Sequence, residues 1–289
     1  MSKSLPTESK SLPTDGIAFF MPVHNEVHNI VPVVEGLLRY FGHQSFESYV
    51  IILVDDGSTD GSRAQCDELE ARYRGNVSVT HHIHNQGYGS ALRSGLEAAL
   101  ATGQPWIGFF DSDDQFRPLT SLHRLVAEVL EHEHRQYEGR IDAAVGHRIS
   151  RADGFTRQLT GRLWHYVSRL MLPHDAHDID CGCKLFRREA IEPIVPRLQG
   201  QYATTSVELM ARLYRDRAHV VNVPVKHYPR VHGHQSGLDL RVVTQSFVSL
   251  RRVARVIERP EHTVVPVSQR FLTHVPEPRE ELQKGGGVA

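Results

Sequence analysis

The first 134 residues alternate between apolar runs of strand length and longer segments whose apolar residues recur at helical spacing. The expected strands of this part lie at 17–21, 48–56, 76–83 and 105–111. Strand–helix units of this length are typical of a mostly parallel sheet with helices on both faces. The alternation therefore predicts the α/β fold class.

The rhythm changes after residue 140, although strands and helices continue. Strands are expected at 142–149 and 219–228, a strand passing into a helix at 181–195, and helices at 155–172, 204–217 and 238–257. SKSLPT occurs twice in the first fifteen residues, and Pro and Glu are frequent beyond about residue 260. We therefore expect a disordered leader at 1–15, one ordered domain at 16–258 and a disordered tail at 259–289.

Composition argues against several classes of protein. The formal net charge is -1, whereas a protein that binds nucleic acid usually carries a basic surface. No stretch approaches the roughly 20 apolar residues that cross a bilayer, and the N-terminus lacks the apolar core of a signal peptide. Cys66, Cys181 and Cys183 imply no disulfide framework and suit a reducing compartment. We expect a cytoplasmic enzyme.

Polar and acidic residues follow three of the expected strands, as PVHNE at 22–26, VDDGSTDG at 54–61 and DSDDQ at 111–115. Ligands of parallel α/β sheets bind beyond the carboxyl ends of the strands. Asp111 and Asp113 are close enough to repel each other, and a divalent cation is the usual remedy. Oxygen ligands favour Mg²⁺ or Mn²⁺ over zinc. The alternative is a solvated acidic turn in which an aspartate caps a helix.

The second acidic segment ends a buried strand at Asp55 and Asp56, and Gly57 allows a sharp turn. A carboxylate there can accept hydrogen bonds from a base or a ribose, and helix capping is the alternative. Nineteen histidines suggest a metal site, with HHIH at 81–84 as the densest group. We interpret that run as the end of a strand.

Six segments, in their order and spacing, resemble family 2 glycosyltransferases with the GT-A fold. They are PVHNEVHNI, VDDGSTDGS, NQGYGSALRSG, DSDDQFRP, VGHRISRADGFTR and DIDCGCKLFRR. The resemblance covers roughly residues 17–237. Within the family, the segments look most like the branch that includes dolichol-phosphate mannose synthase and polyprenyl-phosphate sugar transferases. The resemblance implies a single GT-A domain with a nucleotide-sugar-binding half at 16–115 and an acceptor-binding half at 116–258.

The resemblance also implies roles for the residues of the donor half. Pro22, His24 and Glu26 would line the nucleotide pocket, although the family usually has Tyr at position 24. Asp55 and Asp56 would hold the base and ribose of a UDP- or GDP-sugar. Asp111 and Asp113 would lie near the metal and the diphosphate, and Gln115 would be a further metal ligand.

In the acceptor half, Arg148 with Arg157 resembles the basic pair that receives an acceptor phosphate, and a solvated basic face is the alternative. Asp178 and Asp180 are the two candidates for a general base that an acceptor hydroxyl would need, and either of them could act. A phosphate acceptor is already ionised, and these residues would then orient it or the sugar.

The expected activity is an inverting, metal-dependent sugar transfer, with a polyprenyl phosphate as the main candidate acceptor. A soluble enzyme acting on a small-molecule hydroxyl is the alternative. A sugar nucleotidyltransferase is a remote alternative, because such enzymes carry a Gly-rich phosphate loop after the first strand and this sequence has none there. The helix at 238–257, with its basic face, either packs on the domain or lies on a membrane surface, which would place the enzyme at the cytosolic face of the membrane.

Overall fold

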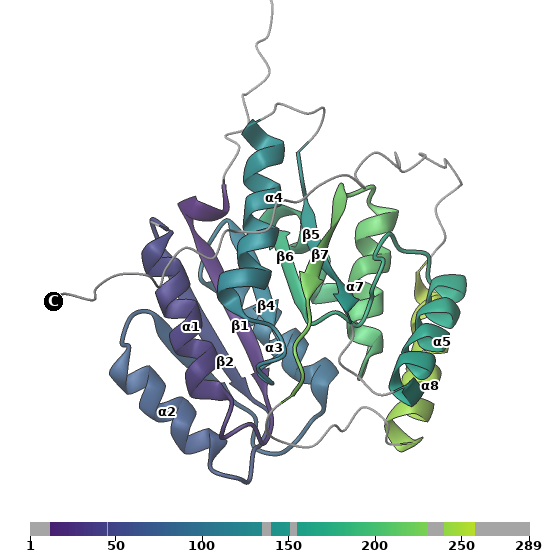
Figure 1. The fold of residues 1–289 in the computed structure, drawn as a ribbon. Coiled ribbons are helices and arrows are strands. Elements are labelled where there is room, and N and C mark those ends of the chain that lie inside the picture. Colours follow the sequence, from purple (N-terminus) through teal and green to yellow (C-terminus); the bar gives the residue numbers. More distant parts are fainter. Residues whose placement is uncertain (1–11, 45, 135–139, 151–154, 231–239, 258–289) are drawn as a thin grey trace, which may run out of the picture. The chain divides into compact units, whose positions relative to one another are not determined.

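A computed structural model describes residues 12–44, 46–134, 140–150, 155–230 and 240–257. This part of the chain forms a seven-stranded sheet in the order β3-β2-β1-β4-β6-β5-β7 (Figure 1). The strands are β1 (Ile17–Val23), β2 (Tyr49–Asp55), β3 (Val77–His81), β4 (Trp106–Phe110), β5 (Ala143–Ser150), β6 (Cys183–Arg187) and β7 (Val220–Lys226). All of the expected strands are confirmed.

One strand runs against the others. β6 is antiparallel to both of its neighbours, β4 and β5, whereas every other pair in the sheet is parallel. The mostly parallel sheet is therefore confirmed. Because β6 is reversed, the loop that precedes it, rather than the one that follows, lies at the edge where the parallel strands end. This orientation brings residues 178–182 to the same edge as the acidic segments.

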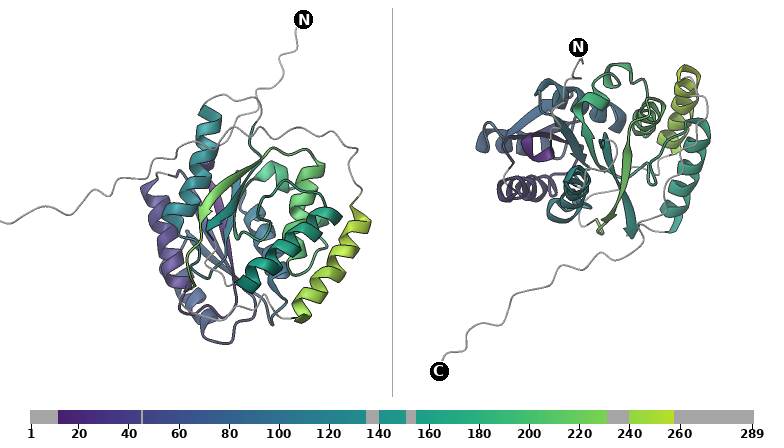
Figure 2. Two further views of the ribbon diagram at one scale, coloured as in Figure 1. Left: turned by 45° about the vertical axis from the view of Figure 1, so that its right-hand side comes forward. Right: turned by 90° about the horizontal axis from the view of Figure 1, so that it is seen from above.

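Helices cover both faces of the sheet (Figures 1 and 2). One hydrophobic core includes residues of α1 (Ile30–His43), α2 (Ser62–Arg72) and α4 (His123–His134). The other includes residues of α3 (Tyr88–Ala101), α6 (Arg188–Ile191), α7 (Thr204–Arg215) and α8 (Leu240–Val256), and α5 (Phe155–Met171) packs against it. Shorter helical turns are Pro13–Asp15, Pro118–Leu122 and Val195–Arg197.

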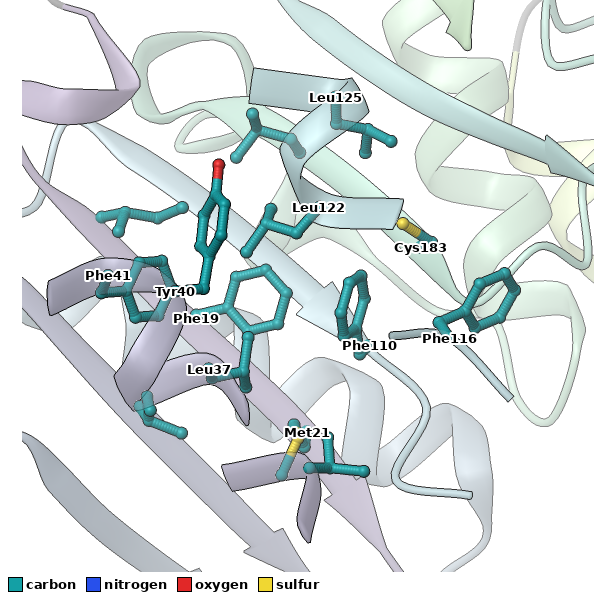
Figure 3. Close-up of a cluster of buried hydrophobic side chains, with 14 of the residues drawn as sticks. Phe19, Met21, Leu37, Tyr40, Phe41, Phe110, Phe116, Leu122, Leu125 and Cys183 are labelled. Atoms are coloured by element: carbon teal, nitrogen blue, oxygen red, sulfur yellow. The ribbon is translucent and has the colours of Figure 1, made fainter. Parts of the chain in front are cut away.

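β1 is buried along its whole length, and its side chains alternate between the two cores because successive residues of a strand face opposite sides. Phe19 packs edge-on against Phe110 of β4, with ring centroids 4.9 Å apart. Figure 3 shows the Phe19 ring between Leu37 of α1 on one side and Tyr40 of α1 and Leu122 of the adjoining turn on the other. Apolar burial on both faces makes the sheet a rigid base for the loops at its edge.

Two boundaries differ from the sequence expectation. The pattern of NEVHNIVPVVEGLLRYF predicts a helix from residue 25, but the helix begins at Ile30, because the preceding residues form a loop in which Asn25 has a left-handed backbone (φ 56°). Pro13–Asp15 of the expected leader form a short 3-10 helix. Residues 1–11 and 258–289 lie outside the described residues. The three cysteines are buried and unpaired, as expected. No helix among the described residues is both long and apolar enough to cross a membrane.

Candidate active site

The loops after β1 and β2 interlock through side-chain hydrogen bonds. The Asn25 side-chain oxygen accepts a hydrogen bond from the Thr59 backbone N–H (2.8 Å), and Asp60 accepts one from the Val27 N–H (3.2 Å). The loop after β4 joins them, since the Ser112 hydroxyl donates to the Pro22 carbonyl (2.7 Å). These hydrogen bonds hold the loops after β1, β2 and β4 together at the carboxyl edge of the sheet.

Asp55 is fully buried, and its carboxylate is held by local partners. It accepts hydrogen bonds from the Ser58 N–H (3.0 Å) and from the Arg63 Nε (2.9 Å), and it lies 2.9 Å from the His81 Nδ1. Burial raises the pKa of this carboxyl, but the hydrogen bonds from Ser58, His81 and Arg63 outweigh it and lower the pKa to about 2. Asp55 therefore stays ionised and fixes the turn after β2.

Asp56 is buried in a similar cage. One oxygen lies 2.7 Å from the His82 Nδ1 and accepts the Gln86 N–H, and the other accepts the Gly87 N–H (2.8 Å). Gly57 turns the chain with φ 68°, where a Cβ would lie 2.5 Å from the Asn85 backbone nitrogen. Both acids thus position the loops after β2 and β3, and their direct contact with a base or ribose stays a prediction.

Pro22, another nucleotide-pocket candidate, lies within β1, and two further candidates lie on the loop after it. His24 is exposed, its Nδ1 is 3.0 Å from the Asp56 carbonyl, and its Nε2 is 2.9 Å from the Asn85 amide nitrogen. Glu26 is half-buried and accepts a hydrogen bond from Asn29 (2.6 Å). Burial raises the pKa of Glu26, against the lowering effect of Asn29 and Arg230.

Acidic residues from two loops, the one after β4 and the one before β6, lie around Tyr88, the first residue of α3. The Tyr88 hydroxyl donates to Asp111 (3.0 Å). The pKa of Tyr88 is raised first by burial and then by Asp111, Asp180 and Asp113, although the residue as a whole is 40% exposed. Burial and the neighbouring Asp111 also raise the pKa of Asp113, to about 7. The fold thus brings Asp111, Asp113 and Asp180, which comes from the loop before β6, close enough to influence Tyr88, and a metal role for Asp111 and Asp113 stays a prediction.

Gly182 allows this close approach. A Cβ at that position would lie 1.8 Å from one Asp111 carboxylate oxygen, which no real contact permits. The Asp111 N–H donates to the Gly182 carbonyl (3.1 Å), and the buried Lys184 amine donates to the carbonyls of Ile179 (3.1 Å) and Cys181 (2.5 Å). The backbone hydrogen bond from Asp111 thus holds the loop before β6 against the acidic segment, and the Lys184 side chain fixes the conformation of that loop.

Arg230 is a cation of this site that the sequence interpretation left out. It pairs with Glu26, and its Nη2 lies 4.0 Å from an Asp113 oxygen. The residue therefore bridges the loop after β7 to the loops after β1 and β4. It places positive charge where Asp111 and Asp113 concentrate negative charge.

Gln115 also joins two loops. Its side chain is buried, and the side-chain nitrogen donates a hydrogen bond to the Tyr228 carbonyl (3.2 Å). The backbone carbonyl of Gln115 accepts a hydrogen bond from the Tyr228 N–H (3.0 Å). This link holds the end of the acidic segment against the chain that carries Arg230. Its role as a metal ligand stays a prediction.

The acceptor-side candidates Arg148 and Asp178 bind each other. The Arg148 guanidinium donates to both Asp178 oxygens, at 2.6 and 2.8 Å, and both side chains are buried. Such a bidentate pair is strong and orients both groups. Asp180 lies near Tyr88 and Arg148, since it influences the pKa of each. Arg157 lies in the first turn of α5, and its side chain is outside the described ones.

The donor set fits a hard divalent cation that is shared with a substrate. Within the described residues, no group of three or more His, Cys, Asp or Glu side chains is arranged to hold a metal ion. Mg²⁺ and similar ions commonly take one or two carboxylates and complete their shell with water and substrate phosphates. Asp111 and Asp113 match that pattern. Burial and Asp111 raise the pKa of Asp113 even though Arg230 lies nearby, so a bound divalent cation would favour its charged form.

Tyr88, Arg230, His81 and His82 were not expected at this site. The signal for Tyr88 was present, because it directly follows the NQG segment after the third strand. His81 and His82 carried a weaker signal, since a strand that ends beside β2 places its last residues next to Asp55 and Asp56. Only the tertiary fold brings Arg230 within reach of the acids.

The sequence profile described as Glycosyl transferase family 2 matches residues 18–195. The chain belongs to glycosyl transferase family 2. It is therefore a glycosyltransferase, as its motifs indicated, and the sugar nucleotidyltransferase alternative is set aside. Two curated relatives share its sequence over most of this chain. Polyprenol monophosphomannose synthase of Mycolicibacterium smegmatis is 28% identical over 237 residues, which cover 79% of this chain and 84% of that protein. Glycosyltransferase AglD of Haloferax volcanii is 29% identical over 222 residues, covering 74% of this chain and 33% of that protein.

Solved structures confirm the GT-A fold. Glucosyl-3-phosphoglycerate synthase from Mycobacterium tuberculosis, in complex with Mn²⁺, UDP and glucosyl-3-phosphoglycerate, has a TM-score of 0.57 and 20% identity and covers 84% of this chain and 81% of its own. The mannosyltransferase PcManGT from Pyrobaculum calidifontis, in complex with GDP-Man and Mn²⁺, has a TM-score of 0.54 and 16% identity. The superposition covers 85% of this chain and 65% of PcManGT. At these identities the likeness establishes the fold.

Proposed function

We propose that this glycosyltransferase moves a sugar from a UDP- or GDP-sugar to a polyprenyl phosphate, with inversion at the anomeric carbon and with Mg²⁺ or Mn²⁺. The observation that carries the proposal is the cluster of Asp111, Asp113 and Tyr88 beside Arg230 at the carboxyl edge of the sheet. The Mycolicibacterium relative is a polyprenol monophosphomannose synthase, and two solved neighbours bind a nucleotide or nucleotide-sugar with Mn²⁺.

On the donor side, Asp111 and Asp113 would hold the cation, which neutralises the charge that develops on the leaving diphosphate. Tyr88 orients Asp111 through its hydroxyl, and Gly182 leaves room for that carboxylate. Arg230 sits close enough to Asp113 to reach a diphosphate placed there. Asp111 and Asp113 share the loop after β4, while Tyr88, Gly182 and Arg230 each come from another segment, so a bound donor would join four segments of the chain.

On the acceptor side, a phosphate is already ionised and needs no general base. Arg148 offers a fixed, buried positive charge at the end of β5, and Asp178 holds it in place. Asp178 is committed to that pair, so Asp180 is the better base for a hydroxyl acceptor. Asp180 also lies beside Tyr88 and the metal pair, where the sugar would sit.

The test is a donor screen that follows nucleoside diphosphate release with Mn²⁺, with and without polyprenyl phosphate. Release that depends on both the metal and the lipid phosphate is expected from one donor. Asp113→Asn should abolish metal-dependent turnover, whereas Asp114→Asn is the matched control, because Asp114 has a left-handed backbone that Asn also tolerates.

Full activity of Asp113→Asn, or undiminished activity in excess EDTA, would contradict the donor site. Sugar transfer to a small-molecule hydroxyl but never to polyprenyl phosphate would contradict the acceptor and favour the hydroxyl alternative. In that case loss of activity in Asp180→Asn would identify the base.

A further inference from the structure

α5 carries a ridge of large apolar side chains that point away from the core. Leu159, Leu163, Tyr166 and Leu170 are each between 57% and 67% exposed. Their spacing of four, three and four residues places them within about 60° of one another around the helix. The opposite side of α5 packs inward through Trp164, whose ring meets Phe247 of α8 at 5.4 Å. The ridge is thus a second apolar face, separate from the one that anchors the helix.

The ridge is bordered by positive charge. Arg162 and Arg169 are exposed on one flank of it. α8 lies beside α5 (Figure 2) and exposes Arg251, Arg252 and Arg255 with two valines among them, Val248 and Val256. The sequences of α5 and α8 together hold seven arginines and no Asp or Glu, in a chain whose formal net charge is -1.

Both helices follow strands that end at the functional edge of the molecule. α5 follows β5 and α8 follows β7, and these strands are parallel to each other and end at the edge that carries the acidic cluster. Ile149, near the end of β5, is 56% exposed and directly follows Arg148. An exposed apolar side chain therefore lies next to the residue that we assign to the acceptor phosphate.

We propose that the exposed faces of α5 and α8 form a docking surface for an anionic lipid bilayer, with α5 lying in the interface. An apolar stripe flanked by arginines is the pattern of helices that lie in a membrane surface, with tyrosine at the headgroup level. The inference rests on the proposed function in one respect: it would hold the acceptor site where a polyprenyl phosphate resides.

Charge decides between this occupant and a second copy of the chain. A two-fold interface through the same surface would face arginines with arginines and supply no acids from either helix. An anionic bilayer supplies negative headgroups for the arginines and acyl chains for the leucines. Each arginine near such a surface strengthens binding roughly fivefold.

The test measures how the full-length chain sediments with vesicles of phosphatidylcholine, with and without phosphatidylglycerol. Binding to the anionic vesicles is expected, and added salt should weaken it. Leu163→Gln should lower the partition coefficient about tenfold. The double variant Arg251→Gln/Arg252→Gln should lower the partition coefficient roughly 25-fold, because each lost arginine contributes a factor of about five.

Matched controls carry the same changes elsewhere on the surface. Leu119 is 56% exposed in the Pro118–Leu122 turn, and Arg39 is exposed on α1, so Leu119→Gln and Arg39→Gln should bind vesicles as the wild type does. The proposal is overturned if the wild type ignores anionic vesicles or if the controls lose as much binding as the ridge variants. A dimer that Leu163→Gln dissociates would overturn it in favour of a second copy.

Sugar transfer to a short, water-soluble prenyl phosphate separates this inference from the proposed function. The ridge variants should keep that activity while losing vesicle binding, because none of the changed residues belongs to the donor or acceptor site. If the wild type binds vesicles as expected but never transfers sugar to any prenyl phosphate, the proposed function fails and the docking surface stands. If transfer to the short acceptor occurs without vesicle binding, the docking surface fails alone.

Discussion

Gly182→Ala should separate activity from stability at this site. The added Cβ would lie 1.8 Å from one Asp111 carboxylate oxygen and 2.8 Å from the other, whereas an ordinary carbon–oxygen contact is more than 3 Å. The Asp111 backbone is held by its hydrogen bond to the Gly182 carbonyl, so the carboxylate itself must rotate away. Its displacement therefore exceeds 1 Å, and its hydrogen bond from Tyr88 is lost or remade.

The two consequences differ in size. A catalytic group misplaced by about 1 Å can cost about 100-fold in rate, equivalent to about 2.7 kcal/mol of transition-state stabilisation. The cost to folding is smaller, because the obstacle is the end of a side chain and a strained rotamer costs only about 0.5–1.5 kcal/mol. The variant should therefore fold normally and lose about two orders of magnitude in kcat/KM.

Nucleoside diphosphate release as a function of Mn²⁺ concentration, together with thermal unfolding, measures both effects. Gly42→Ala is the matched control, since Gly42 lies in α1 with no atom near its Cβ position. That change should leave activity intact and stabilise the fold by roughly 0.5–1 kcal/mol. Wild-type kcat/KM in Gly182→Ala would refute the assignment of Asp111 to the site, and loss of folding would refute the estimate of its strain.

Three further predictions concern the same loops. Tyr88→Phe should lower kcat/KM roughly tenfold and raise the Mn²⁺ concentration needed for half-maximal activity, because Asp111 loses its hydroxyl donor; an unchanged metal dependence would exclude this positioning role. Arg230→Gln should raise the donor KM about tenfold with little change in acceptor KM, which initial-rate kinetics would show. Asp55 has its pKa lowered to about 2, so the stability that its ionised form contributes, roughly 2 kcal/mol, is complete above pH 3.8 and is lost as the pH falls toward 2. Unfolding curves of the wild type should show that acid limb, and Asp55→Asn should lack it.

Periodicity was a sufficient guide to the sheet. β1 and β4 are apolar on both faces because helices cover both, and such runs are legible in sequence. The reversal of β6 could not be predicted, because a buried strand of five residues has the same composition in either direction. That reversal nevertheless decides that Asp180 and Gly182, which precede the strand, lie at the site.

The acidic motifs could also be recognised in the sequence, but the side chains that contact them could not. Asp55 and Asp56 were expected to face a nucleotide, and the structure surrounds them with Arg63, His81 and His82. Those contacts arise because β3 lies beside β2 in parallel register, which puts His81 opposite Asp55. A spacing of 26 residues along the chain carries no hint of that distance.

The sequence by itself determined which chemistry is available here: carboxylates at strand ends, a turn that only glycine permits, and strand–helix units that place them on one edge. Those features are local, and local backbone and side-chain preferences act on near neighbours in the chain. Only the tertiary structure decided how the charges are paired. It joined Arg148 to Asp178, brought Arg230 from the loop after β7 to Asp113, and placed the Tyr88 hydroxyl on Asp111. Electrostatic interactions depend on distance in space, so they could be assigned only after the fold had brought these side chains together.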